Sequence, residues 1–134
     1  MAERTASCSC GQLTVQISGE LVRVSICHCL ACQRRTGSVF GEQARFRRED
    51  IRRISGHSTE YRRVGDEGSV ISFRFCPTCG ATVYYTINDD PELVAIPVGA
   101  FADPSFQTPV RSVYESRKHE WVVVPDGPGI EHLD

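Results

Sequence analysis

The sequence predicts a mainly β fold of several short sheets with very little helix. Apolar and polar residues alternate with a period of two along most of the chain, and no long stretch repeats with the helical period of 3.6. A further observation concerns the seven cysteines, which fall into three tight clusters between the expected strands. Clusters this tight suit a metal that prefers thiolates, such as zinc, so we expect metal to tie the sheets together.

The first two expected strands lie on either side of a glycine turn. Residues 13–17 and 22–26 alternate in the strand pattern, with a Gly-Glu pair between them. Alternating runs joined by a short turn are typical of a β-hairpin, which is the pairing predicted here. A cysteine pair precedes the first of these strands, and Cys27 ends the second.

The remaining elements follow in order. Residues 30–36 fit one or two helical turns that end at Gly37, since glycine commonly terminates helices. Phe40 and Trp121 are expected in the core. No linker or repeat interrupts the chain, so we expect a single domain over residues 1–134, with its core at about 7–124. Further strands are expected at residues 39–47, 51–55, 58–64, 70–75, 82–87, 93–98, 113–114 and 121–124.

Composition limits the partners. The formal net charge of −2 gives no reason to expect a membrane, and nucleic acid stays a minor option, although nine arginines against four acids between residues 34 and 63 can attract an anion. No apolar run approaches the roughly 20 residues of a membrane span, and no signal peptide is visible. We therefore expect a cytoplasmic protein with reduced thiols; a homo-oligomer is compatible with the sequence.

The strongest single motif is Cys76-Pro77-Thr78-Cys79-Gly80. Both sulfurs of such a turn can converge on one tetrahedral ion at about 2.3 Å, and Gly80 can adopt the positive φ that this turn often needs. The same spacing occurs in redox-active cysteine pairs, but those normally lie in a thioredoxin-like βαβ context that this chain lacks. Zinc is therefore the favoured interpretation.

Cys8 and Cys10 supply a second pair, separated by one residue and followed by Gly11. In extended chain the two sulfurs lie on one side. Joined to the pair at 76 and 79, they would form a four-sulfur site that closes a loop of over sixty residues. Zinc in such a site can supply about 10–16 kcal/mol of folding free energy.

The third cluster places Cys27, Cys29 and Cys32 within six residues. His28 points the opposite way if this segment is extended, so it is interpreted as a packed histidine and not as a ligand. Spacing alone leaves another partition open, in which the 76/79 pair joins Cys27 and Cys29. Three thiolates with an open fourth position suit an incoming thiol more than the activation of water.

Several segments together match a known pattern. Over roughly residues 7–121 the chain resembles the glutathione-dependent formaldehyde-activating family. Arg111 departs from that pattern, because family members often have a histidine there. The segments that carry the resemblance are Cys8-Ser9-Cys10-Gly11, Cys27-His28-Cys29 with Cys32, Thr36-Gly37-Ser38-Val39-Phe40, Phe75-Cys76-Pro77-Thr78-Cys79-Gly80, and the late Ser116 and Trp121.

The resemblance implies a fold of several curled, zinc-tied antiparallel β-sheets with two zinc ions per chain. It implies a structural zinc on the four cysteines Cys8, Cys10, Cys76 and Cys79. It implies a second zinc, of catalytic type, on Cys27, Cys29 and Cys32. Thr36, Gly37 and Ser38 directly follow this cluster, where they are expected as a helix cap or as contacts to a thiol ligand.

The activity implied by the resemblance is the condensation of formaldehyde with glutathione to S-hydroxymethylglutathione, which is a carbon–sulfur lyase activity. The expected partners are then a small-molecule thiol, glutathione or a similar one, and an aldehyde. The alternative hypothesis is a non-catalytic, zinc-stabilised binding module in which both metals are structural. That alternative expects the second site to be sealed by protein.

Overall fold

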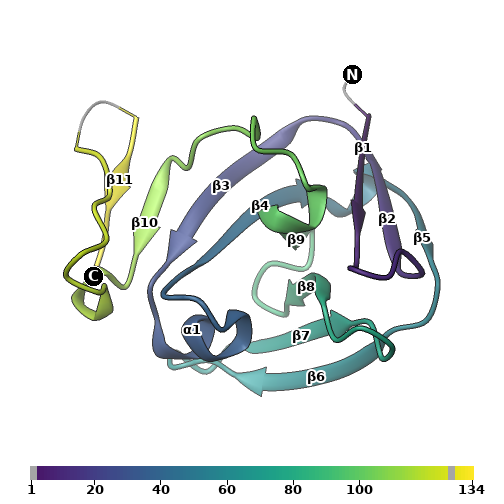
Figure 1. The fold of residues 1–134 in the computed structure, drawn as a ribbon, viewed down its shortest axis with the longest axis horizontal. Helices are drawn as coiled ribbons and strands as arrows, with labels where there is room; N and C mark the ends of the chain where they lie inside the picture. The colour runs from purple at the N-terminus through teal and green to yellow at the C-terminus, as the bar shows by residue number, and fades with distance from the viewer. Residues whose placement is uncertain (1–2, 127–128) are drawn as a thin grey trace.

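The computed structural model describes residues 3–126 and 129–134 and contains two β-sheets (Figure 1). Strands β1 (Glu3–Ser7), β2 (Thr14–Ser18) and β5 (Ile51–Ser55) form the small sheet in the order β1-β2-β5. The large sheet has the order β11-β10-β3-β4-β9-β8-β7-β6. Its strands are β3 (Leu21–Cys27), β4 (Gly41–Arg47), β6 (Thr59–Val64), β7 (Val70–Phe75), β8 (Thr82–Ile87), β9 (Leu93–Pro97), β10 (Arg111–Val113) and β11 (Glu131–His132).

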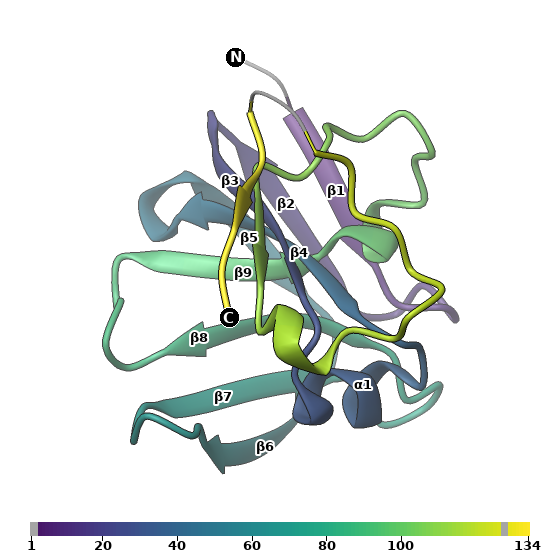
Figure 2. The ribbon, with the colours of Figure 1, turned by 90° about the vertical axis from the view of Figure 1, so that its left-hand side faces the viewer.

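Helix is scarce, which confirms the predicted mainly β class. Within the described residues, the α-helix α1 (Leu30–Thr36) is accompanied by three short 3₁₀ turns: η1 (Arg48–Asp50), η2 (Val98–Phe101) and η3 (Glu115–Arg117). Figures 1 and 2 both place α1 at the ends of β6 and β7, directly after β3. In the part of the chain that is described, no helix is long and apolar enough to cross a membrane.

The core lies between the two sheets. Alternate residues of the large sheet, such as Val24, Phe46 and Ile96, pack against Val15 and Ile17 of the small sheet, and all five are buried. The residues between them point to the other face of the large sheet, because side chains alternate across a strand. That second face carries Cys27 at the end of β3, and it forms the site described below.

The predicted hairpin between residues 13–17 and 22–26 is wrong. Both segments are strands, but β2 pairs with β1 and β5, whereas β3 pairs with β4 and β10. Val15, Ile17 and Val24 nevertheless share one core cluster. Two strands that pack face to face need the same alternation as two strands that pair edge to edge, so the pattern does not distinguish the two arrangements.

The C-terminal segment also departs from expectation. Residues 121–124 form no strand, and Trp121, expected in the core, has 72% of its surface exposed. The last two strands instead run parallel: β10 lies between β3 and β11. Phe40 is half-buried, with its ring edge-on to His28. The Glu3–Ser7 strand, absent from the sequence-based expectations, completes the small sheet.

Gly56, in the turn between β5 and β6, lies where a side chain cannot fit. Its φ is +96°, and a Cβ atom there would stand 1.9 Å from the carbonyl oxygen of Gln12. Gly56→Ala is expected to lower the free energy of unfolding by at least about 2 kcal/mol, measured by urea denaturation. Gly68→Ala is the control, because Gly68 has a φ of +90° with open space around it. Equal losses in both variants would show that the close approach to Gln12 contributes nothing.

The short strand β11 is held by a pair that responds to pH. His132 Nδ1 lies 2.8 Å from Glu115 Oε2, and its other ring nitrogen lies 3.6 Å from Asp126. The hydrogen bond to Glu115 raises the pKa of His132 above its usual value near 6.5. Because the pKa of His132 is raised in the folded protein, the stability contributed by the His132–Glu115 pair is complete below about pH 6.5. It is lost as pH rises through the folded-state pKa.

We therefore expect the hydrogen-exchange protection factor of the Leu133 amide, which donates to Ser112, to fall as pH rises from 6 to 9. Normalising to the intrinsic exchange rate removes the ordinary pH effect. His132→Gln is the control and should show low, nearly pH-independent protection. The same pH dependence in that variant would assign the effect to another group.

Candidate metal centres and the adjoining cavity

Four cysteine sulfurs converge where the small sheet meets the turn between β7 and β8. Cys8, Cys10, Cys76 and Cys79 place their sulfur atoms within 4.8 Å of one another. The Cys8–Cys10 and Cys10–Cys76 sulfur separations are 3.6 and 3.7 Å. Four sulfurs arranged tetrahedrally at 2.3 Å from zinc are about 3.8 Å apart, so the spacing fits that ion.

Hydrogen-bond donors surround these sulfurs. Cys76 Sγ accepts from Gln12 Nε2 at 2.9 Å and from the amide of Thr78 at 3.3 Å, and Cys8 Sγ accepts from the amide of Leu13 at 3.3 Å. Burial opposes ionisation of Cys76, but the bond from Gln12 and the backbone donors prevail and lower its pKa to about 6. Thiolates, not thiols, ligate metals, so the donor set fits a metal site.

Gln12 is a residue that sequence reasoning missed. Its carboxamide also bonds the backbone of His57, through Nε2 to the carbonyl at 2.8 Å and through Oε1 to the amide at 2.8 Å. One side chain therefore connects the turn before β6 to a cysteine of the four-sulfur cluster. Gly80, in contrast, adopts the positive φ (+81°) that its position in the cysteine turn predicted.

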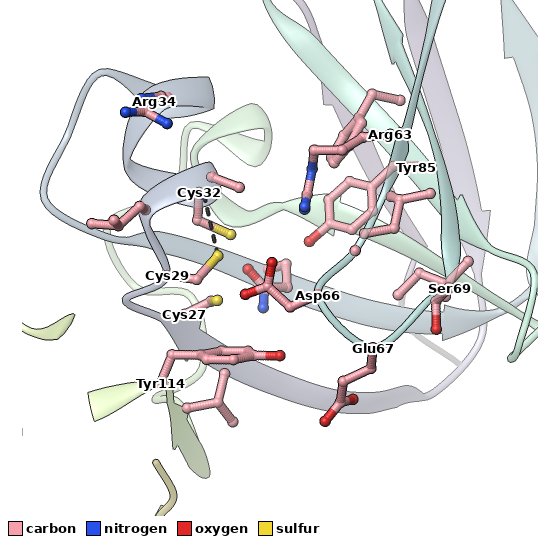
Figure 3. A pocket seen from close by; sticks show the side chains of 18 of the residues that line it. Cys27, Cys29, Cys32, Arg34, Arg63, Asp66, Glu67, Ser69, Tyr85 and Tyr114 are labelled. Carbon is pink, nitrogen blue, oxygen red and sulfur yellow. Dashed lines mark hydrogen bonds between the residues drawn. The ribbon is translucent and has the colours of Figure 1, made fainter. Parts of the chain in front are cut away.

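The second cluster is built at the junction of β3 and α1. Cys27 is the last residue of β3, Cys29 is the N-cap of α1, and Cys32 lies in the first turn of the helix. Their sulfurs lie within 4.8 Å of one another, and the described residues offer no fourth histidine, cysteine or carboxylate within that range. The amide of Cys32 donates to Cys29 Sγ at 3.3 Å, as the N-terminus of a helix allows (Figure 3).

His28 lies on the opposite side of the strand from these sulfurs, as the extended geometry predicted. Its ring is buried, and Nε2 forms a 3.0 Å hydrogen bond with Ser112 Oγ of β10. Burial lowers its pKa, which favours the neutral ring. His28 therefore packs behind the cluster and is not part of it.

Electrostatics also fits a cation at the second cluster. Hydrogen bonding from Cys27 and Cys32 lowers the pKa of Cys29 to about 2, and the contact with Cys29 raises the pKa of Cys27. Three sulfurs this close share one negative charge readily, but ionising all three requires a compensating positive charge. The guanidinium of Arg63 lowers the pKa of Cys29 further, and a divalent metal would supply the rest.

A cavity of about 570 Å³ opens beside the second cluster (Figure 3). The large sheet curves, so that β6, β7 and β8 face the end of β3, and α1 borders the same space. Phe73 and Tyr85 provide aromatic walls, and Tyr114 lies on the far side of Cys27. The charged residues of the wall are Arg34, Arg45, Arg63, Asp66, Glu67 and Arg117.

Thr36, Gly37 and Ser38 do not line this cavity. Thr36 ends α1, with its hydroxyl bonded to the Cys32 carbonyl at 2.9 Å, and Gly37 is the C-cap in the left-handed conformation. The helix-cap alternative describes their geometry, and contact with a thiol ligand stays a prediction. The lining residues Gln43 and Tyr85 went unrecognised, because they come from strands separated in sequence and carry no motif. Arg45, also in the lining, belongs to the arginine-rich stretch at residues 34–63 that was expected to attract an anion.

The fold and the two clusters define a β protein with a closed four-cysteine site and an open three-cysteine site beside a cavity. More specifically, the chain belongs to the glutathione-dependent formaldehyde-activating enzyme family, whose model matches residues 3–117. A solved structure of a Rhodobacter sphaeroides protein, a structural-genomics target, has a TM-score of 0.57 and 24% identity over 77% of this chain and 90% of that one. This likeness shows the fold alone. No curated protein matches the chain.

Proposed function

We propose that this protein is a zinc-dependent carbon–sulfur lyase that joins glutathione, or a similar thiol, to formaldehyde or releases them from the adduct. Family membership supports the enzyme class and both substrates. The observation that carries the proposal is the position of Cys27, Cys29 and Cys32. Their three sulfurs line the 570 Å³ cavity, so a ligand that enters it meets them directly.

In this proposal each cluster holds one zinc ion. Cys8, Cys10, Cys76 and Cys79 hold a structural ion, and Cys27, Cys29 and Cys32 hold the second. Zinc at the second cluster would lower the pKa of an incoming thiol and favour its thiolate. None of the seven cysteines forms a disulfide, which fits a reducing compartment and supports a cytoplasmic location.

The chain's own residues then orient the reactants. The carbon–sulfur bond forms as the thiolate attacks the aldehyde carbon, and the carbonyl oxygen takes up the proton that the thiol released. Aromatic walls at Phe73 and Tyr85 exclude water from one side of the cavity, and burial raises the pKa of Tyr85 to about 12, so its hydroxyl stays neutral. Holding both reactants at one wall reduces the entropic cost of the encounter.

The test is exchange spectroscopy by NMR on the zinc-loaded protein with glutathione and formaldehyde at equilibrium. Adduct formation and release should accelerate in proportion to protein concentration. The spontaneous rate, measured at the same zinc concentration without protein, is the control. Exchange that is no faster with protein than without it would refute the proposal and favour the non-catalytic binding module. That alternative expects a second site sealed by protein, whereas the second cluster lies beside an open cavity.

A further inference from the structure

The cavity face of strands β3 and β4 carries a row of polar residues that leads away from the second cluster. Cys27 pairs with Gly41, Ser25 with Gln43, and Arg23 with Arg45 in the antiparallel register. These positions alternate by two, so their side chains share one face of the sheet. Gln43 and Arg45 line the cavity together with Cys27.

The two arginines at the end of this row face each other, and neither forms an ion pair with an acidic group among the described residues. Like charges directly opposite on paired strands destabilise a sheet. Among the described residues, neither Arg23 nor Arg45 has an acidic group within 4.0 Å, whereas the nearby Arg111 pairs with Glu131 at 3.0 Å. Burial lowers the pKa of Arg23, and the charges of Arg45 and Arg111 lower it further, although the more weakly acting Asp90 and Glu131 raise it. The folded protein thus carries an unfavourable pair that an anion would relieve.

Polar atoms along the row also lack partners. Arg23 Nε, Ser25 Oγ and Gln43 Oε1 are buried without a hydrogen bond to any described residue. Ser25 is only 2% exposed and Gln43 only 4% exposed. Buried polar groups in native proteins are nearly always bonded. Of these three residues Gln43 lines the cavity, and its unpartnered carboxamide oxygen indicates a polar molecule bound there.

The length of the row restricts the ligand. Arg23 lies four residues from Cys27 along β3, which is about 13 Å between Cα atoms at 3.3 Å per residue. A molecule that spans the row is as long as a peptide of about two to four residues, since each extended residue covers about 3.5 Å. Short thiols such as 2-mercaptoethanol cannot reach from one end to the other.

We propose that Arg23 and Arg45 bind a carboxylate of a peptide thiol whose sulfur lies at Cys27, Cys29 and Cys32, with the Gln43 carboxamide bonding the peptide between them. The inference rests on the proposed function for the position of the thiol. It adds the basis of substrate specificity. The cavity selects thiols whose carboxylate is separated from the sulfur by the length of a short peptide, and Arg45 is the residue that binds this carboxylate. Arg45 lines the cavity wall, and Arg23 supports it from the neighbouring strand.

The experiment measures thiol binding by calorimetry on the zinc-loaded protein without aldehyde. Arg45→Gln and Arg23→Gln should each raise the Kd for glutathione at least about tenfold, the usual cost of a lost charged hydrogen bond. The Kd for glutathione diethyl ester, which lacks both carboxylates, should change less than about twofold in the same variants. Arg47→Gln is the matched control, because Arg47 lies on the same strand, is exposed and is not part of the cavity wall.

Unfolding is checked separately. Without ligand, Arg45→Gln should melt at or above the wild-type temperature, since it removes the repulsion across the strand pair. A carboxylate-dependent loss of binding supports the inference even if the wild type shows no turnover, which would refute only the proposed function. Unchanged glutathione affinity in both variants, an equal loss for the acid and the diester, or no glutathione binding to the wild type would overturn it.

Discussion

Replacing Cys76 by serine is expected to unfold most of the chain at 25 °C. Cys76 is fully buried, and its sulfur lies 3.7 Å from that of Cys10, which is 66 residues earlier in the chain. Structural zinc supplies about 10–16 kcal/mol to folding, whereas a whole domain is stable by only about 5–15 kcal/mol. Losing one of four ligands therefore removes free energy comparable to the entire stability of the protein.

Circular dichroism and metal content per chain measure this result. Cys76→Ser should lose the cooperative thermal transition, and a strong chelator should produce the same state from the wild type. Thr78→Ser is the matched control, because Thr78 is exposed and contributes only its backbone amide to the Cys76 sulfur. A Cys76→Ser protein that melts near the wild-type temperature with one metal fewer would show that this cluster is not the structural one.

The positions of the strands were easier to predict from the sequence than the way the strands pair. Alternation is a local property, so β4 to β9 lie close to their expected positions. Whether β2 pairs with β3 or packs against it depends on contacts far along the chain, such as those of β5 with β2. Trp121 failed for a related reason: hydrophobicity alone does not place a residue in the core when its segment runs over the surface.

The cysteine clusters were predictable because the spacing of metal ligands can be recognised within short sequence segments. Spacing alone left their partition open, and the grouping that the structure shows is the one implied by the resemblance to the family. The direction of His28 followed from strand geometry. The cavity wall was not predictable in this way. Gln43, Arg63 and Tyr85 become neighbours of the cluster only because the large sheet curves, and no local pattern encodes that curvature.

Cys32→Ser is expected to have the opposite profile from Cys76→Ser: it should abolish turnover and leave the fold intact. The three sulfurs of the second cluster lie within six residues, so a metal there closes almost no loop and adds little to folding through chain entropy. Helix α1, which the cluster begins, has no buried residue. Losing an outer-shell partner of a metal costs about 10–100-fold in affinity or activity, so losing a direct ligand should cost at least about 100-fold.

Cys32→Ser and Cys76→Ser make the same chemical change in different clusters, so each variant is the control for the other. If each cluster holds one zinc ion, as proposed, zinc content should fall from two to one per chain in Cys32→Ser and in Cys27→Ser, while the thermal transition of both variants stays cooperative. Exchange spectroscopy with glutathione and formaldehyde should then return to the spontaneous rate. If Cys32→Ser lost one zinc ion but kept its turnover, the second cluster would not be the catalytic site. If it unfolded like Cys76→Ser, both clusters would be structural, and the binding-module alternative would become the better account of the protein.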